Sequence, residues 1–197
     1  MVPGKASSEY QKACGALKDK KLDAAEQHVR KALDVYPNYA AAWVVLGQIL
    51  AREEKRVEAR AACSQAMHVD ASYVPPYICL ADFAVRDGDW DQVSVLADRA
   101  QALDPVSDPF TFYFTAYVEL HFKQIHQAEA NAEKALSLDM WHHMPELHYL
   151  MAQIDEAKGD LRDETIHLRE YLKQAPNAAD SATAKTLLAQ IQATPQK

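Results

Sequence analysis

The stretch that decides the fold is residues 40–73, which read AAAWVVLGQILAREEKRVEARAACSQAMHVDASY. Its first half carries an aromatic residue, a leucine and a small residue, and its second half carries two alanines at helical spacing: Trp43, Leu46, Gly47, Ala59 and Ala66. Charged residues separate the two halves around Glu54-Lys55. Because apolar residues at intervals of three and four positions are typical of helices, this stretch predicts two helices joined by a short turn.

The same pattern recurs along the chain with a period of about 34 residues. Three sets of aligned positions carry mostly small residues at separations of 34, 34, 35 and 36. They are Ala13, Gly47, Ala81, Ala116 and Ala152, then Ala25, Ala59, Val93, Ala128 and Glu164, then Ala32, Ala66, Ala100, Ala135 and Tyr171. Small side chains at these positions let paired helices approach closely, while larger ones fill the space between them. We therefore expect a helical repeat array.

A period of this length with small residues at these positions resembles the tetratricopeptide repeat. The resemblance covers about residues 6 to 178 and is strongest in residues 40–73. The next repeat follows with Tyr77, Leu80, Ala81 and Asp104-Pro105. The repeats also look like those of bacterial members of the family. Departures from the pattern occur in the first, fourth and fifth repeats, at Glu9, Phe112, Thr115, His148, Glu164 and Tyr171.

The resemblance implies an all-α fold: an α-α superhelix, or solenoid, of five helix hairpins plus a C-terminal capping helix. The repeats are expected at residues 6–39, 40–73, 74–107, 109–142 and 145–178. Turns inside the hairpins are expected at Lys20-Lys21, Glu54-Lys55, Gly88-Asp89, Lys123-Gln124 and Gly159-Asp160. The capping helix is expected at 179–193, with flexible tails at 1–5 and 194–197. Its apolar face would consist of Ala184, Leu187, Leu188 and Ile191.

Two extra residues near 141–144 fall in a loop between repeats. We expect Trp141 to fold back over the repeat junction. An exposed aromatic side chain is the alternative.

Composition excludes several classes of partner. The formal net charge of −7 argues against nucleic acid and against anionic lipid surfaces, since phosphate binding needs clustered Lys and Arg. No stretch approaches the roughly 20 apolar residues of a membrane span, so the chain is expected to be soluble. Its three cysteines, Cys14, Cys63 and Cys79, show neither C-x-x-C nor zinc-ligand spacing. They are expected to be buried thiols in a reducing compartment, which favours the cytoplasm, with an excised domain of an exported protein as the alternative.

Positions that face the concave groove in the tetratricopeptide family indicate where a ligand would bind. Carried over to this chain, they form a candidate peptide-binding groove of aromatic, aliphatic and charged residues: Tyr10, Val44, Gln48, Arg52, Ile78, Asp82, Arg86, Phe110, Tyr113, Tyr117, His121, Tyr149 and Gln153. Tyrosine and arginine are enriched in binding interfaces. The competing interpretation is that Phe110, Tyr113 and Tyr117 pack against the next repeat.

No constellation in the sequence indicates catalysis or a cofactor. The chain lacks G-x-S-x-G, G-x-x-x-x-G-K, G-x-G-x-x-G and H-E-x-x-H. The histidines, including His121, His126, His142, His143 and His148, lack the i, i+3 or i, i+4 spacing of a helical metal site. The carboxylate pairs Asp155-Glu156 and Asp163-Glu164 are expected on solvated helix ends. We therefore expect no enzyme activity, no cofactor and no metal.

The sequence thus favours a non-catalytic scaffold that captures an extended or helical segment of another protein in the groove between repeats two and five. A structural alternative is a domain of a longer protein that docks onto its own neighbour or self-associates. A third is an accessory domain that binds a substrate or a small ligand for an enzyme partner. Fold resemblance alone does not choose among them.

Overall fold

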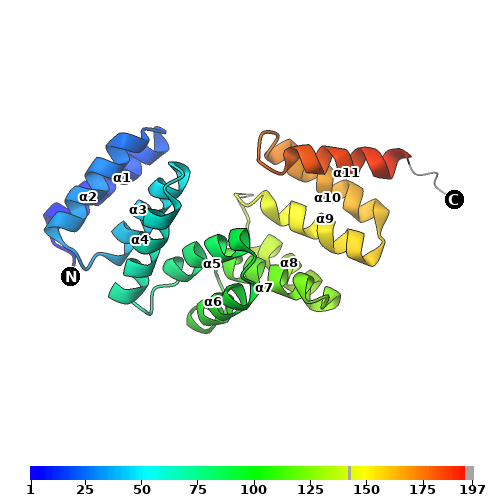
Figure 1. The fold of residues 1–197 in the computed structure, drawn as a ribbon, viewed down its shortest axis with the longest axis horizontal. Helices are drawn as coiled ribbons and strands as arrows, with labels where there is room; N and C mark the ends of the chain where they lie inside the picture. Colours follow the sequence, from blue (N-terminus) through cyan, green and yellow to red (C-terminus); the bar gives the residue numbers. More distant parts are fainter. Residues whose placement is uncertain (142, 194–197) are drawn as a thin grey trace. The chain divides into compact units, whose positions relative to one another are not determined.

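A computed structural model describes residues 1–141 and 143–193, and over that range the chain is all-helical (Figure 1). Eleven helices are present in the described residues: α1 (Gly4–Lys18), α2 (Leu22–Val35), α3 (Ala40–Arg52), α4 (Arg56–Val69), α5 (Pro75–Asp87), α6 (Trp90–Leu103), α7 (Pro109–His121), α8 (Ile125–Leu138), α9 (Glu146–Lys158), α10 (Leu161–Gln174) and α11 (Ser181–Ala193). Over these residues, no helix is both long and apolar enough to cross a membrane. The expectation of five hairpins and a C-terminal helix is confirmed.

Each hairpin turns where the sequence predicts it. The first ten helices pair in order, α1 with α2 through α9 with α10, and each pair packs along its length. Every turn contains one residue in the left-handed backbone region, namely Lys20, Glu54, Gly88, Lys123 and Gly159. Glycine adopts this conformation without steric cost, whereas a residue with a Cβ atom costs roughly 1 to 2 kcal/mol there. The three hairpin turns that use Lys20, Glu54 or Lys123 in place of glycine therefore contain a small local backbone strain.

The three aligned columns form the interior of the hairpins. Apart from Gly47, which is also buried, every member of the three columns is at most 3% exposed. Gly47 of α3 lies so close to α4 that an added Cβ atom would come within 2.4 Å of the Cys63 Sγ and 3.1 Å of the Ala59 carbonyl oxygen. The small side chain at this position is thus required by the helix spacing.

The aromatic residue near the start of two first helices anchors the loop that precedes it. The Trp43 Nε1 donates a hydrogen bond to the Pro37 carbonyl at 2.7 Å. The Tyr77 hydroxyl donates one to the Ala71 carbonyl at 2.9 Å, across the same separation of six residues. These bonds satisfy loop carbonyls next to the helix interfaces and fix how the chain enters each repeat.

The chain divides into two compact units, Met1–Asp104 and Pro105–Lys197, which are described separately below. The first unit contains α1 to α6, in which α2 packs on α3, α4 on α5 and α3 on α5. The second contains α7 to α11, in which α8 packs on α9, α7 on α9, and α11 on α10. The unit boundary lies at Asp104-Pro105, at the end of the third repeat.

The C-terminal helix covers the last hairpin with the face that the sequence indicates. Buried Ala184 of α11 packs with Ala152, Leu168 and Tyr171, and Leu187, Leu188 and Ile191 lie against this cluster. At the other end of the chain, α1 begins at Gly4, inside the segment expected as a tail. Residues 194–197 of the second expected tail lie outside the described residues.

Two of the three cysteines are joined in a disulfide, although the sequence analysis expected free thiols. Cys63 of α4 and Cys79 of α5 form a disulfide across 6.2 Å between their Cα atoms, and Cys14 is a free thiol. The bond joins the second helix of repeat two to the first helix of repeat three. The expectation of buried free thiols is therefore wrong for this pair.

The expectation that Trp141 folds back over the repeat junction is wrong, and the loop before α9 shows why. The buried Asp139 carboxylate accepts hydrogen bonds from the backbone N–H groups of His143 at 3.0 Å and Met144 at 2.9 Å. These bonds close the loop and direct Met144 inward, so that it is 2% exposed. Trp141, on the arc of the loop, is 78% exposed. The extra residues thus present an aromatic side chain to solvent and do not fold it over the junction.

Candidate functional site

Four tyrosines of the first unit form an aromatic cluster, which we call the first tyrosine cluster: Tyr10, Tyr36, Tyr39 and Tyr73. Tyr10 lies on α1, Tyr39 immediately precedes α3, and Tyr73 precedes α5 by two residues. The ring centroids of Tyr10 and Tyr39 are 5.0 Å apart, and those of Tyr36 and Tyr39 are 6.2 Å apart. All four side chains are half-buried. The cluster therefore brings together the starts of three successive repeats.

Burial is the first cause of a raised pKa for three of these tyrosines, Tyr10, Tyr39 and Tyr73. Burial raises the pKa of Tyr10, and the Cys14 thiol, hydrogen-bonded to its hydroxyl, raises it further. Burial and then Cys14 raise the pKa of Tyr39, and burial, Tyr39 and Asp70 raise that of Tyr73. A neutral phenol offers a wide apolar face and a hydroxyl that can donate or accept a hydrogen bond. The cluster is thus chemically suited to contact a peptide, and Tyr10 is its one member that the groove positions predicted.

The other predicted groove residues of the first unit differ in accessibility. Val44 is 4% exposed and belongs to the core, so it offers little surface to a ligand. Gln48 and Arg52 are exposed, and Ile78 is half-buried. Asp82 and Arg86 form an ion pair at 3.0 Å, with side chains 47% and 61% exposed. Exposed pairs of this kind contribute about 0 to 1 kcal/mol, so a competing carboxylate can displace Asp82 at small cost.

The second unit contains a corresponding set, the second tyrosine cluster: Tyr113, Tyr117, Tyr149 and Tyr171. The ring centroids of Tyr113 and Tyr117 are 5.7 Å apart, and those of Tyr149 and Tyr171 are 5.0 Å apart. Tyr113 and Tyr117 of α7 pack partly against the buried residues of α9, including Leu150. Packing against the next repeat, the competing interpretation, therefore holds for part of these two side chains.

The C-terminal segment places a carboxylate near the second tyrosine cluster. The pKa values of Tyr117, Tyr149 and Tyr171 are raised by burial first and then by Asp180. Asp180 directly precedes α11. Three phenols thus face a negative charge supplied by the chain itself, a feature that the groove positions did not predict.

The remaining predicted residues of the second unit lie at its edge or in its interior. Phe110 is 38% exposed, and exposed His121 lies edge-on to the Phe122 ring, 5.2 Å between centroids. Half-buried Gln153 has a buried Oε1 atom with no hydrogen-bond partner among the described residues.

Charged groups are buried in the last hairpin, contrary to the expectation of solvated helix ends. Asp155 is 1% and Glu164 is 3% exposed. Burial raises the pKa of the Asp155 carboxyl, and its ion pair with Lys158, 3.2 Å between Oδ1 and Nζ, opposes the rise. Burial also raises the pKa of Glu164, followed by the charges of Glu156 and Asp155. Glu156 is exposed, as the sequence predicted.

A histidine pair lies beside these carboxyl groups. The Nδ1 atoms of His148 and His167 are 3.0 Å apart, and the His167 Nε2 is 3.9 Å from an Asp155 oxygen. Within the described residues, no group of three or more His, Cys, Asp or Glu side chains is placed to hold a metal ion. His142, one of the histidines considered from the sequence, lies outside the described residues.

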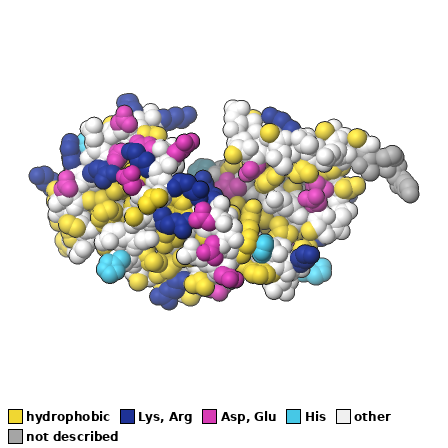
Figure 2. Space-filling model, in the orientation of Figure 1, with side chains coloured by type: hydrophobic (Ala, Val, Ile, Leu, Met, Phe, Trp, Pro, Cys, Tyr) yellow, Lys and Arg dark blue, Asp and Glu magenta, His cyan; other side chains and the backbone are white. Residues whose placement is uncertain are grey.

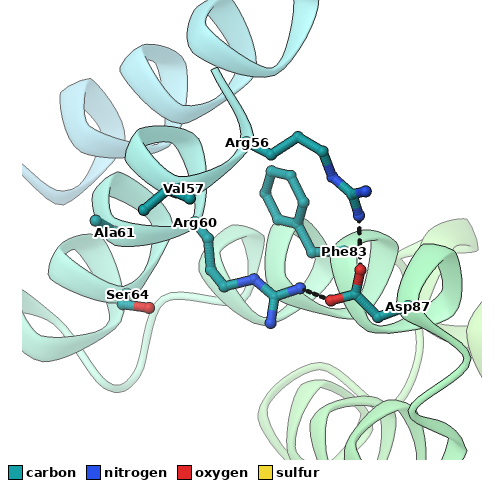
Figure 3. A pocket seen from close by; sticks show the side chains of 7 residues that line it. All are labelled: Arg56, Val57, Arg60, Ala61, Ser64, Phe83 and Asp87. Atoms are coloured by element: carbon teal, nitrogen blue, oxygen red, sulfur yellow. Dashed lines mark hydrogen bonds and ion pairs between the residues drawn. The ribbon is translucent and has the colours of Figure 1, made fainter. Parts of the chain in front are cut away.

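A shallow pocket in the first unit was not predicted. It has a volume of about 580 Å³ and is lined by Arg56, Val57, Arg60, Ala61, Ser64, Phe83 and Asp87 (Figure 3). The side chains come from α4 and from the C-terminal half of α5. The i, i+4 spacing of Arg56 and Arg60 is visible in the sequence but was not used, and their common partner Asp87 follows only from the packing of the two helices.

Comparison with known proteins identifies the fold. No protein-family model and no curated protein matches the sequence. Among solved structures, TTC0263, a thermophilic tetratricopeptide-repeat protein of Thermus thermophilus, is 18% identical with a TM-score of 0.72 over 93% of this chain and 99% of its own. A chain of the APC/C heterotetramer Cut9–Hcn1 is 19% identical, with a TM-score of 0.80 over 97% of this chain and 38% of its own.

A third structure is YrrB, described as a tetratricopeptide-repeat protein with an unusual peptide-binding site. It is 16% identical, with a TM-score of 0.57 over 90% of each chain. Similarity at these identities concerns the arrangement of helices and does not extend to ligands. Together with the hairpins, the turns and the buried small columns, it shows that the chain has the fold of the tetratricopeptide-repeat proteins.

Proposed function

We propose that the chain is a non-catalytic protein-binding module that captures segments of a partner protein at its two tyrosine clusters. The observation that carries the proposal is that half-buried tyrosines lie on or just before the first helices of successive repeats in both units. They are Tyr10, Tyr39 and Tyr73 in the first unit and Tyr113, Tyr117 and Tyr149 in the second, where Tyr149 packs on buried Tyr171. Clustered tyrosines bind other chains well because they combine a large contact area with a polar hydroxyl at low entropic cost.

Exposed groove residues on α3, the helix that Tyr39 precedes, provide the variants that test this function. Gln48 and Arg52 lie one helical turn apart on exposed positions of α3. Glu substitutions at both positions change the charge of the surface and leave the core intact, so their effect on stability is within about 0.5 kcal/mol. The matched control is Gln65→Glu/Arg99→Glu, which makes the same chemical changes at exposed positions of α4 and α6.

The experiment is an affinity capture from a lysate of the source organism, quantified by mass spectrometry for the wild type and both double variants. We expect proteins that the wild type and the control retain equally and that Gln48→Glu/Arg52→Glu loses. Equal retention by all three, after a check that they melt alike, would place the binding surface elsewhere.

Self-association is a second candidate, favoured by one observation. Met140 and Trp141 are adjacent and are 74% and 78% exposed. Exposed apolar side chains that adjoin one another often mark contact surfaces. If a second copy covers them, light scattering will give a dimer mass that falls to the monomer mass in Trp141→Ser. A monomer at all concentrations for the wild type would exclude this candidate.

A further inference from the structure

The pocket between α4 and α5 faces a different direction from the predicted groove. On α5 the groove residues are Ile78, Asp82 and Arg86, whereas the pocket residues are Phe83 and Asp87. At roughly 100° per residue, the two sets point about 120° apart around the helix. The pocket is therefore a surface of its own, and its role is independent of the function proposed for the tyrosine clusters.

Two guanidinium groups are held in place at one side of the pocket. The Arg56 Nη2 donates to one oxygen of the Asp87 carboxylate at 2.7 Å, and the Arg60 Nη2 donates to the other oxygen. The Arg60 guanidinium carbon also lies 5.5 Å from the centroid of the Phe83 ring, in cation–π contact. Figure 3 shows both arginine side chains extending from α4 toward Asp87, with the Phe83 ring between the two helices.

This arrangement leaves positive charge and donor capacity at the pocket rim. Two arginines share one aspartate, so the three side chains carry a net charge of one unit. A guanidinium has five N–H donors, and each of these uses one of them on Asp87. The arginine side chains are 55% and 38% exposed, so their other donors reach solvent. The rim thus presents two positioned donor groups to an incoming carboxylate.

The other side of the pocket is apolar. Val57 is 85% exposed, one of the most exposed large hydrophobic side chains in the described residues, and Ala61 follows it one turn later on α4. The buried Phe83 ring forms the base. An apolar ligand side chain on Val57 and Ala61 would lie beside the guanidinium groups. On the face visible in Figure 2, basic side chains lie beside acidic and apolar ones.

The disulfide fixes the distance between the pocket walls. Cys63 immediately precedes Ser64 of the pocket, and Cys79 lies one helical turn before Phe83 on α5. Because the covalent bond joins the two wall-forming helices next to the pocket residues, the spacing of the arginines, the valine and the ring is set before any ligand arrives. Preorganisation of this kind reduces the free-energy cost of binding.

We propose that this pocket binds an acidic peptide segment of a partner protein in which a carboxylate adjoins an apolar side chain. The carboxylate accepts hydrogen bonds from Arg56 and Arg60, and the apolar side chain covers Val57, Ala61 and Phe83. Charge complementarity selects an acidic segment over a basic one, and the apolar wall selects an amphipathic segment over a run of carboxylates alone.

The test uses fluorescence anisotropy with a fluorescein-labelled synthetic peptide of alternating Glu and Leu residues. Two reference peptides replace all Glu by Gln or all Leu by Ser. Arg56→Gln/Arg60→Gln removes the donors, and Val57→Gln removes the apolar contact. Arg52→Gln/Arg86→Gln is the groove control, and Arg99→Gln/Arg162→Gln, at exposed arginines of α6 and α10, is the matched control away from both surfaces. All of these side chains are exposed or half-buried, so the variants should fold.

We expect the wild type and Arg99→Gln/Arg162→Gln to bind the Glu-Leu peptide equally, and Arg56→Gln/Arg60→Gln to bind it more weakly by about tenfold or more. Val57→Gln should weaken the binding of the Glu-Leu peptide. It should leave the affinity for the reference peptide with Ser in place of Leu unchanged. Equal affinity for the wild type and Arg56→Gln/Arg60→Gln, or no binding by the wild type at about millimolar peptide, would overturn the proposal. A loss confined to the groove control would also overturn it and would assign the peptide to the groove.

Discussion

The two units solve the same packing problem with different side chains. In the first unit the second column consists of Ala25, Ala59 and Val93, and a disulfide joins two of the repeats. In the second unit the column ends in Glu164, and the neighbouring Asp155 is buried as well. The second column thus accepts small apolar residues in the first unit and a buried carboxyl group in the second. The first unit also contains a covalent link between two repeats. Stability should consequently depend on redox conditions in the first unit and on pH in the second.

The two tyrosine clusters differ in the side chains that lie near their hydroxyl groups. In the first cluster the Cys14 thiol is hydrogen-bonded to Tyr10, and the Asp70 carboxylate contributes to the raised pKa of Tyr73. Three tyrosines of the second cluster lie near the Asp180 carboxylate, which belongs to the segment that leads into the C-terminal helix. A carboxylate of the chain thus acts on three rings of the second cluster but on one ring of the first. We therefore expect the first cluster to accept an acidic or polar ligand segment more readily than the second.

The largest expected effect concerns the disulfide. Removing it with Cys63→Ala/Cys79→Ala should destabilise the first unit by about 2 to 4 kcal/mol, because the bond closes a loop between residues 16 positions apart. Urea denaturation with hydrogen exchange will show the loss, which should be confined to residues 1–104. Cys14→Ser is the control and should leave the effect of a reductant unchanged. If the wild type is equally stable with and without reductant, the predicted contribution of the disulfide to stability is wrong.

Next in size is the close approach of α3 and α4. Gly47→Ala should destabilise the first unit by about 1 to 3 kcal/mol, since the new Cβ atom meets the disulfide-bonded Cys63 Sγ and the Ala59 backbone. Thermal unfolding measures the change. Gly15→Ala in α1 is the matched control, because no atom lies within 4 Å of its added Cβ. It should stabilise the chain by up to about 1 kcal/mol. A neutral Gly47→Ala would show that the helices are farther apart.

The hairpins could be predicted from the sequence because their determinants are local and repeated. The columns containing Gly47 and Ala59 fix the helix pairing, and the turn positions follow from the same period. The disulfide could not be predicted in this way, because Cys63 and Cys79 meet only through the packing of two repeats. Tyr39 and Tyr73 were missed because they lie just before their helices, outside the positions carried over from the family pattern.

The buried carboxyl groups were missed for a different reason. Asp155 and Glu164 look like ordinary charged residues near helix ends, and the sequence gives no sign that each faces the partner helix. The exposed Trp141 depended on hydrogen bonds to Asp139, which loop length alone does not reveal. In each case the deciding interaction is non-local or specific to one repeat, so a period-based alignment cannot detect it.

A smaller effect is expected at the buried carboxyl of the second unit. The pKa of Glu164 is raised above its ordinary value of 4.5. The folded chain therefore binds this proton more tightly than the unfolded chain, and stability falls as pH rises between 4.5 and the raised pKa. Glu164→Gln should stabilise the second unit by about 1 kcal/mol at neutral pH and reduce this slope, with the part due to buried Asp155 remaining. Urea denaturation at several pH values provides the measurement, with exposed Glu133→Gln of α8 as the control. An unchanged pH slope in Glu164→Gln would show that another group titrates.

The smallest effect is expected at Asp180. Asp180→Asn removes the charge that raises the pKa of Tyr117, Tyr149 and Tyr171, so the phenols should ionise at lower pH in ultraviolet titration. Stability should change by less than about 0.5 kcal/mol, because Asp180 is exposed. Asp163→Asn, an exposed aspartate of α10, is the control. A titration curve identical to that of the wild type would mean that Asp180 does not act on these rings.

We propose that partner segments bind at the first helices of the repeats. Hydrogen exchange measured by mass spectrometry, on the free chain and on the chain bound to the partner recovered by capture, tests this binding mode most directly. We expect slower exchange in α1, α3 and the start of α5, including the peptides that contain Tyr10, Tyr39 and Tyr73. Protection confined to the second helices α2, α6 and α8, with these tyrosine peptides unchanged, would contradict it.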